Sequence, residues 1–193
     1  SFKIYAPEGA KKVKVRVMDT LPWIPITQPR EVELACVDGY VACDVDQDVL
    51  YIAQVERYGK NGNVGKAFMG GFHMTSGAIA SSVGHDNHNI IVMGTNFEDM
   101  SIAVNHLVEI GGGQCLVDGG EIIECVEYPL CGLLSDLSCE ELAAKKSALN
   151  AACAERGCII SIPFMFLSFI CLAALPACAI TDHGFINVLT LQI

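Results

Sequence analysis

Apolar and polar residues alternate in the first third of the chain in a way that predicts strands. Residues 13–18, Val-Lys-Val-Arg-Val-Met, alternate strictly, which is typical of a strand with one face in solvent. Residues 31–36 and 40–45 flank Asp38-Gly39, a dipeptide that favours tight turns. We therefore predict one strand at 13–18 and a hairpin that joins the two later segments.

The middle of the chain carries longer apolar runs that indicate buried strands. Residues 49–57 form a mostly apolar strand, and the glycine- and asparagine-rich run 59–63 predicts the turn after it. Residues 77–82 and 89–94 are apolar, small or β-branched, as in strands that are covered on both faces. The polar residues between these two runs therefore lie where one strand ends and the next begins.

Two helices are predicted from their capping residues. Thr95 or Asn96 caps a helix that runs to about Ile110, and acidic residues in its first turn suit the positive end of the helix dipole. Ser138 caps a second helix over 139–156. The remaining predicted elements are strands at 114–118, 121–127 and 185–191 and a buried apolar stretch at 162–175.

Strands and helices interleave along the chain, and several strand pairs are hairpins. This order favours an α+β or α/β layered fold, in which a mixed β-sheet carries a few packing helices. We expect residues 1–48 to form N-terminal strands packed on a main unit at 49–193, with the whole chain as one compact unit. The 193 residues are enough to bury a sizeable core.

The composition strengthens the expectation of extensive burial. Hydrophobic residues make up 52% of the chain and charged residues 18%, which excludes a disordered chain. Part of the apolar surface is expected to pack against something outside this chain. The ten cysteines contain no C-x-x-C pair and mostly lie in apolar runs, so we predict free thiols in a reducing, cytoplasmic environment.

Charge and hydropathy argue against two classes of partner. The net charge of −10 is unlike that of a nucleic-acid-binding domain, which normally presents a basic face. Residues 158–180 contain no charged residue and are long enough to cross a bilayer. Pro163 and Pro176 interrupt this stretch, so we expect a buried core segment and no membrane contact.

The densest polar cluster joins two of the predicted apolar strands. It contains His85, Asp86, His88 and Asn89, and its place at a strand end is one where ligand sites commonly form. Two histidines and a carboxylate within four residues are able to bind a metal or to move protons, with His85 and His88 as candidate metal ligands. The alternative is a polar turn whose imidazoles bond to nearby backbone groups.

Glu56 and Arg57 end the strand predicted at 49–57, and three interpretations of this pair stay open. The carboxylate and the guanidinium are able to line the site and orient a polar ligand. They are also able to brace the turn around His85. Finally, the two side chains are able to form a salt bridge at the rim, which would stabilise the fold little.

Several familiar motifs are missing or incomplete. Residues 59–66 faintly resemble a phosphate loop, but Lys60 stands where glycine is needed and Ala67 replaces the Ser or Thr that binds Mg²⁺. The chain has no H-x-E with P-C-x-x-C, which excludes the small zinc-dependent cytidine deaminases. It also has no H-x-H pair, the mark of metal-dependent amidohydrolase barrels, and no G-x-S-x-G elbow.

A set of short segments stands in a recognisable order from about residue 50 to the end of the chain. The most specific is His85-Asp86-Asn87-His88-Asn89. The others are Val55-Glu56-Arg57, 62–66, 70–72, 76–83, 94–96, 98–100, 111–113, 117–120, 129–135, 163–165 and 167–169. In this order and spacing they resemble the C-terminal part of the adenine deaminase family, within the amidohydrolase superfamily.

The resemblance is broken at three positions. Family members usually show a histidine after the Glu-Arg pair, where this chain has Tyr58. They often carry a lysine where this chain has Thr75, and a threonine where it has Phe166. The number of cysteines is also atypical. We therefore assign no family role to these three positions.

The resemblance implies a parent hydrolase that converts adenine to hypoxanthine and ammonia in purine salvage. It implies a (β/α)₈ barrel whose metal centre, often binuclear with Mn²⁺ or Fe²⁺, lowers the pKa of the attacking water, while a carboxylate handles proton transfer. The barrel ligands lie N-terminal to this chain, so we expect the chain alone not to deaminate adenine. The implied partners are that barrel, adenine and further copies in a homo-oligomer.

Alternative roles stay open for the domain itself. In the first, it packs on the barrel and brings His85, Asp86, His88 and Asn89 near the mouth of the active site, where they bind substrate, shuttle protons or hold an accessory metal. In the second, it is a structural and oligomerisation domain whose apolar segment 158–180 forms an interface. A third role is a regulatory module that binds a small molecule.

Overall fold

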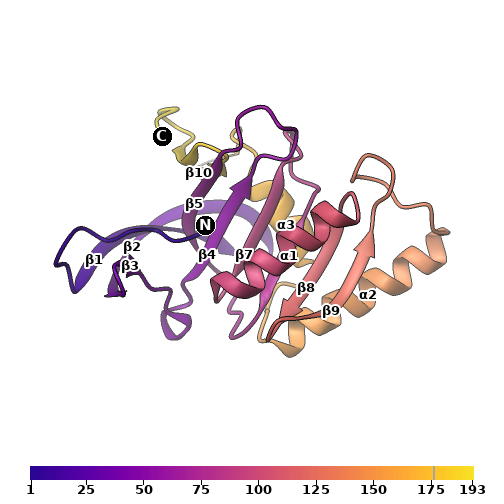
Figure 1. Ribbon diagram of the computed structural model, residues 1–193, viewed down its shortest axis with the longest axis horizontal. Coiled ribbons are helices and arrows are strands. Elements are labelled where there is room, and N and C mark those ends of the chain that lie inside the picture. Colours follow the sequence, from indigo (N-terminus) through magenta and orange to yellow (C-terminus); the bar gives the residue numbers. More distant parts are fainter. Residues whose placement is uncertain (176) are drawn as a thin grey trace.

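One mixed sheet organises the computed structural model, which describes residues 1–175 and 177–193 (Figure 1). Its strands are β1 (Lys12–Leu21), β2 (Ile24–Val37), β3 (Tyr40–Val41), β4 (Leu50–Val55), β5 (Val64–Gly70), β6 (Ala78–Ser81), β7 (Ile90–Gly94), β8 (Gly113–Asp118) and β9 (Glu121–Glu127). They lie in the order β3-β2-β1-β5-β4-β7-β6-β8-β9. Among the described strands only β1 and β5 pair in parallel, so the predicted mixed sheet is confirmed, and these strands do not close into a barrel.

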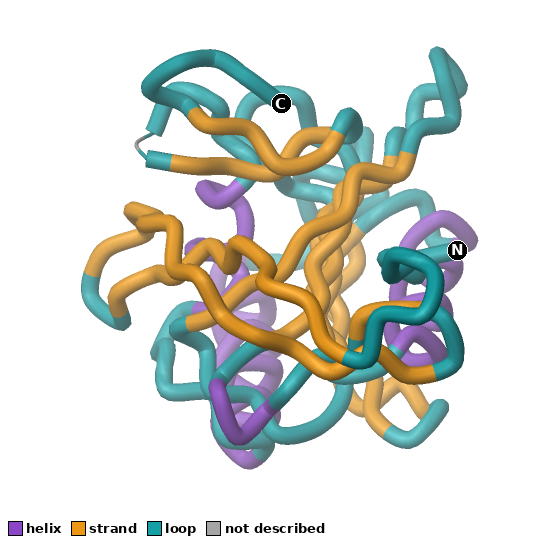
Figure 2. The backbone as a smooth tube through the Cα atoms, turned by 90° about the vertical axis from the view of Figure 1, so that its left-hand side faces the viewer, coloured by secondary structure: helices purple, strands orange, loops and turns teal. Residues whose placement is uncertain are grey.

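Helices cover both faces of the sheet and give the layered α+β fold that the sequence predicts. They are α1 (Phe97–Glu109), α2 (Cys139–Glu155) and α3 (Pro163–Ile170), with a short 3-10 helix at Val45–Gln47. Figure 1 shows α1 in front of the strands and α3 behind them, and Figure 2 shows helices on both sides of the strands. Met100 and Leu107 of α1 pack on one face, and Leu149 of α2 and Leu167 of α3 on the other. Burial on both faces explains the continuous apolar runs of β6 and β7.

A small antiparallel ribbon of β10 (Cys178–Thr181) and β11 (Gly184–Asn187) packs against β5. Gly65 of β5 lies so close to this ribbon that a Cβ there would collide with the carbonyl oxygen of Thr181. At the other end of the ribbon, the amide of Ala177 donates to the carbonyl of Thr27 over 2.7 Å. The end of the chain is thus fixed to strands from its beginning.

The capping residues lie where the sequence predicts them. Asn96 caps α1, and its Oδ1 accepts the amide of Asp99 over 2.8 Å. Ser138 and Glu141 form a reciprocal capping box at the start of α2. Both helices therefore begin where their caps indicate, because these side chains satisfy amides that have no partner within the helix.

Two predicted strands are shorter in the structure because a side chain accepts the backbone amides that would otherwise pair. The segment predicted at 40–45 pairs with β2 only at Tyr40–Val41, and the Asp44 carboxylate then accepts two amides of the following 3-10 helix. The strand predicted at 185–191 ends at Asn187, whose Oδ1 accepts two amides of the next turn. Such local acceptors compete with strand pairing.

Three strand segments were not predicted. Strand β2 extends back to Ile24 and pairs along almost all of β1, with Pro22-Trp23 as the connection between them. Strand β5 follows directly after the predicted turn at 59–63 and pairs with β4 as a hairpin. Strand β10 precedes the ribbon turn. The predicted division at residue 48 stays a prediction, although β1–β3 join the same sheet as the later strands.

The long apolar segment supplies core side chains. Phe164, Leu167 and Ile170 of α3 are buried, and Pro163 stands in the first turn of this helix, where its missing amide costs nothing. Pro176 lies outside the described residues. Within the described part of the chain, no helix is long and apolar enough to span a membrane. All ten cysteines are free thiols, as predicted.

Candidate functional site

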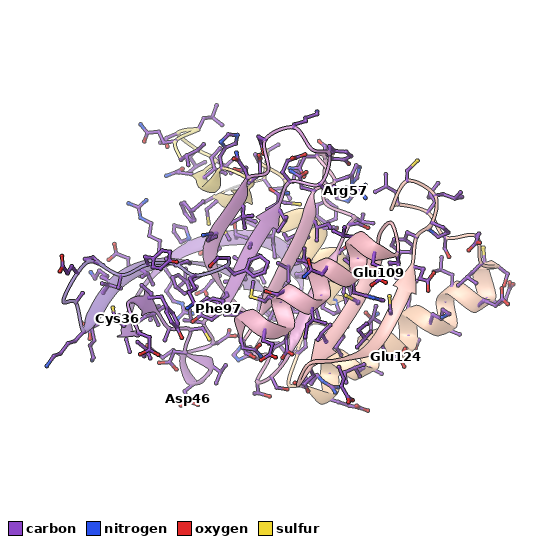
Figure 3. All side chains as sticks on the ribbon, in the orientation of Figure 1. Cys36, Asp46, Arg57, Phe97, Glu109 and Glu124 are labelled. Carbon is purple, nitrogen blue, oxygen red and sulfur yellow. The ribbon has the colours of Figure 1, made fainter. Side chains whose placement is uncertain are left out.

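Three loops meet at one end of the strands, which we call the loop edge. Strands β4, β6 and β9 all end there, and they are followed by the loops 56–63, 82–89 and 128–137. Figure 3 labels Arg57 on this edge, above the strands in that view. Because the same edge collects the polar cluster predicted between β6 and β7, it is the candidate functional site.

The cluster forms a compact turn, residues 85–89, which we call the His turn. The amide of His88 donates to the carbonyl of Gly84 over 2.6 Å and closes it. Asn87 stabilises the turn from within, because its Oδ1 accepts the amide of Asn89 over 3.0 Å. The same oxygen accepts a bond from Nε2 of Gln54 over 2.8 Å. The His turn is therefore held by β4 as well as by its own backbone.

The rings of the two histidines lie edge to face. Their ring centroids are 6.1 Å apart, with the rings nearly perpendicular. The ring of His85 also meets the edge of Phe169 at a centroid distance of 4.7 Å. The amide of His85 donates to the carbonyl of Ser168 over 2.9 Å. Contacts with α3 thus fix His85 at the side of the turn that faces this helix.

His88 is the titratable group of the turn whose environment is most informative. Burial, the neighbouring His85 and the positive charge of Arg57 together hold the pKa of His88 below its ordinary value. The imidazole is therefore neutral near neutral pH, and a neutral imidazole both donates and accepts a proton. Among the described residues, its buried Nδ1 has no hydrogen-bond partner.

Arg57 braces the His turn from the end of β4. Its Nε donates to the carbonyl of His88 over 2.7 Å, and its Nη2 donates to the carbonyl of Cys131 over 2.8 Å. The hydroxyl of Tyr58 donates to the same His88 carbonyl over 3.3 Å. Of the three interpretations of Glu56 and Arg57, the geometry favours bracing, and no ion pair joins them within the described chain.

Glu56 is occupied by its own loop. Its two carboxylate oxygens accept the amides of Tyr58, Lys60, Asn61 and Gly62 over 2.5–3.2 Å. Burial acts to raise the pKa of Glu56, but these backbone amides outweigh it and lower the pKa. The carboxylate therefore ends β4 at Val55, two residues before the predicted end, and shapes the loop.

Asp86 and Asn89 differ sharply in exposure. Asp86 is exposed at the tip of the turn. Asn89 is only 5% exposed, and its Oδ1 accepts the amide of Arg57 over 3.4 Å. The structure thus brings His85, Asp86 and His88 together at the surface, whereas Asn89 holds the turn against β4.

Gln54 is the residue of this site that sequence reasoning missed. Its side chain is fully buried in β4, and its Oε1 lacks a partner among the described residues. A buried polar atom without a partner is costly, so its retention in a core strand indicates a role. The signal was present, because Gln54 is the one amide in the apolar run 49–55.

The three positions that break the family pattern have different surroundings. Tyr58 is half-exposed at the loop edge and contacts Arg57 and the His88 carbonyl. The hydroxyl and amide of Thr75 both donate to the carbonyl of Arg156, at the end of α2. Phe166 is buried in the core. Only Tyr58 therefore contributes to the candidate site.

The residues present do not fit a metal centre. In the regions 1–175 and 177–193, no group of three or more His, Cys, Asp and Glu side chains is placed to hold a metal ion. His85 and His88 alone offer two nitrogen donors, whereas a protein metal site usually has at least three ligands. Metal binding by these two histidines stays a prediction.

Comparison with known proteins identifies the relatives of this chain. The family described as "Adenine deaminase C-terminal domain" matches residues 25–192. The adenine deaminase of Moorella thermoacetica is 39% identical over 188 residues, which is 97% of this chain and 32% of that protein. Adenine deaminase 1 of Carboxydothermus hydrogenoformans is 44% identical over 176 residues, or 90% of this chain and 29% of that protein.

A bacterial relative outside these two gives the same result. The adenine deaminase of Mesorhizobium japonicum is 43% identical over 192 residues, which covers 99% of this chain and 32% of that protein. The chain thus spans about a third of the length of the curated relatives that it matches.

Proposed function

Since the chain belongs to the adenine deaminase C-terminal domain family, we propose that it is the C-terminal domain of a longer, cytoplasmic adenine deaminase. That enzyme hydrolyses adenine: water adds to the purine carbon that bears the amino group, ammonia leaves and hypoxanthine remains. The names of the relatives support this reaction. Their length supports a further domain, which in this proposal is the barrel that binds Mn²⁺ or Fe²⁺.

The domain's own contribution is to hold the His turn at the mouth of the active site. His88 is neutral there and is able to relay a proton between substrate and solvent. His85 lies beside it, and the exposed carboxylate of Asp86 is able to accept a hydrogen bond from an exocyclic amino group or from ammonia. Asn89 and Arg57 position these groups and do not touch substrate.

The observation that carries this proposal is the bracing of the His turn by two different side chains. Gln54 holds it through Asn87, and Arg57 holds it through the carbonyl of His88. An ordinary surface turn does not require a fully buried glutamine beneath it. Rigid support for exposed, titratable side chains is the arrangement that catalytic and binding groups need.

The test is a double substitution, His85→Ala with His88→Ala, in the longer enzyme. We expect turnover of adenine to fall by about tenfold to a hundredfold, because proton transfer by a positioned side chain contributes at least that much. The matched control is His106→Ala, which removes a half-buried histidine of α1 outside the His turn. Turnover and metal content equal to those of the control would reject the proposal.

A structural and oligomerisation role is the second candidate. The segment around the start of α3 leaves Ile159, Ile162 and Met165 about half-exposed, at 52%, 48% and 50%. These side chains would form the interface between copies. Substitution of Ile162 and Met165 by Asp should then dissociate the enzyme in analytical ultracentrifugation. An unchanged sedimentation coefficient would exclude this interface.

A further inference from the structure

A short turn beside the His turn presents two leucines to solvent. We call residues 130–134 the leucine turn. Leu130 and Leu134 exchange backbone hydrogen bonds, each over 3.2 Å, and form an isolated antiparallel bridge. Residues paired in this way project their side chains to the same side. The two side chains are 53% and 65% exposed, so the turn forms a small apolar surface.

The leucine turn is held firmly against the sheet. The hydroxyl of Ser82, at the end of β6, donates to the carbonyl of Gly132 over 2.5 Å. Arg57 donates to the carbonyl of Cys131. Gly132 has a positive φ of 73°, and a Cβ at this position would collide with Nη1 of Arg57. A turn that is already rigid loses little conformational entropy when it binds a partner.

The same guanidinium fixes the distance between the leucine turn and the His turn. Nε of Arg57 bonds to His88 in one turn, and its Nη2 bonds to Cys131 in the other. A partner that contacts the leucine turn is therefore connected through Arg57 to the turn that carries His85 and His88. The exposed Leu189, Leu191 and Ile193, in contrast, lie on the terminal turn, away from Arg57.

We propose that the leucine turn is the docking contact between this domain and the remainder of the longer adenine deaminase. The inference rests on the proposed function and specifies how the His turn is brought into place. Its occupant is the rest of the same polypeptide, because this chain spans only 29–32% of the relatives' length. Half-exposed Tyr58 and its neighbour Arg57 add an aromatic ring and a guanidinium, two of the groups that protein interfaces favour.

The chain carries its own probe for this contact. Cys131 lies within the leucine turn and is exposed, and Cys139, at the start of α2, is exposed as well. We would treat the native longer enzyme with N-ethylmaleimide and follow both peptides by mass spectrometry. Cys131 should react about tenfold or more slowly than Cys139, because a covered thiol reacts only during transient opening. Equal rates would overturn the proposal.

Dilution shows whether the leucine turn is covered by the rest of the same polypeptide or by a second copy of it. Protection of Cys131 within one polypeptide does not depend on protein concentration, whereas protection by a second copy falls as the oligomer dissociates. The labelling is therefore repeated at concentrations above and below dissociation of any oligomer. Protection that persists in the monomer supports the proposal, and protection that is lost overturns it in favour of a contact between copies.

A pair of matched variants tests the contact itself. Leu130→Asp with Leu134→Asp should raise the labelling rate of Cys131 toward that of Cys139 and lower turnover of adenine. The control, Leu189→Asp with Leu191→Asp, changes two leucines that are 73% and 71% exposed and should alter neither quantity. Circular dichroism establishes that both variants fold. Unchanged protection of Cys131 in the Leu130 and Leu134 variant would contradict the inference.

This design separates the inference from the proposed function. Slow labelling of Cys131, with normal turnover in the His85 and His88 variant, would retain the docking contact and reject the catalytic use of the His turn. Fast labelling of Cys131, with low turnover in the His85 and His88 variant, would reject the docking contact and retain the catalytic use of the His turn.

Discussion

The loop edge and the opposite edge, at the other end of the strands, are both rich in polar residues. They differ in whether their buried polar atoms have hydrogen-bond partners. At the opposite edge, buried Asp99 accepts the amides of Gly119 and Gly120 and the side-chain amide of Asn96. In the same region, both oxygens of Asp19 bind Arg30. At the loop edge, in contrast, buried atoms of Gln54 and His88 have no partner within the described residues.

The polar groups of the opposite edge serve the fold. The carboxylates of the opposite edge have donors in their own chain, and Asp118 likewise binds Arg156 and Ser76. Their removal should cost stability without affecting catalysis. The loop edge keeps polar groups unsatisfied and leucines exposed, and proteins retain such features where a function compensates for them. Stability and turnover should therefore respond differently at the two edges.

The largest expected effect on stability is at the opposite edge. Asp99 is 2% exposed and accepts three hydrogen bonds at the junction of α1 with the turn between β8 and β9. Asp99→Ala should lower the free energy of unfolding by about 3 kcal/mol, because three partly buried donors lose their acceptor. Urea unfolding measures this loss. Turnover of the longer enzyme at low temperature should stay the same, and a large fall would contradict the comparison.

Arg57→Met should lower both the free energy of unfolding and the turnover of adenine. The free energy of unfolding should fall by about 2 kcal/mol, since two backbone carbonyls lose a charged donor. Turnover should also fall, because the His turn and the leucine turn lose their common brace. Arg57→Lys is the matched control that keeps the charge. It should recover part of the stability but little turnover, because an ammonium does not span two carbonyls in the fixed geometry of a guanidinium.

Gln54→Leu should lower turnover while leaving the free energy of unfolding almost unchanged. The substitution removes a buried oxygen without a partner, so the free energy of unfolding should change by less than about 1 kcal/mol in either direction. Turnover should fall because Asn87 loses its bond to β4. Gln54→Glu introduces a charge at the same buried place and should destabilise the fold. A Gln54→Leu enzyme with full turnover would show that this side chain only fills space.

The smallest effect is the pH dependence of stability at His88. Its pKa in the folded protein lies below the ordinary value, so the folded state resists protonation more than the unfolded state does. The stability contributed by neutral His88 is therefore fully present above the ordinary pKa and is lost as the pH falls. His88→Gln should make the free energy of unfolding fall less steeply between about pH 7 and 5. Parallel curves for both proteins would contradict this assignment.

The sequence predicted the elements whose signals are local. The caps Asn96 and Ser138 and the apolar runs of β6 and β7 each act within a few residues, and all are confirmed. The long hairpin of β1 and β2 was missed because Pro22-Trp23 is not one of the glycine- or asparagine-containing dipeptides that mark two-residue hairpin turns, so only the pairing of the two strands reveals it. The mixed sheet was predictable from its hairpins, whereas the parallel pairing of β1 with β5 was not.

At the candidate site too, local features were predictable from the sequence and contacts between distant residues were not. The His turn was found because its residues are adjacent, and their assignment to function remains a prediction. The division of labour within it was not predictable. The burial of Asn89 and the occupation of Glu56 by its own loop depend on where backbone amides lie. The links from Arg57 to Cys131 and from Gln54 to Asn87 join residues 74 and 33 positions apart.

The ribbon of β10 and β11 has a consequence for how the chain folds as it is synthesised. The hydroxyl of Thr27 accepts the amide of Cys178, which lies 151 residues later. Contacts of such high sequence separation form late, after the chain between them is ordered. On the ribosome, β2 and β5 therefore lack their contacts with the ribbon until nearly the whole domain has left the exit tunnel. During that interval their apolar faces stay exposed, and we expect a nascent chain in this state to bind chaperones.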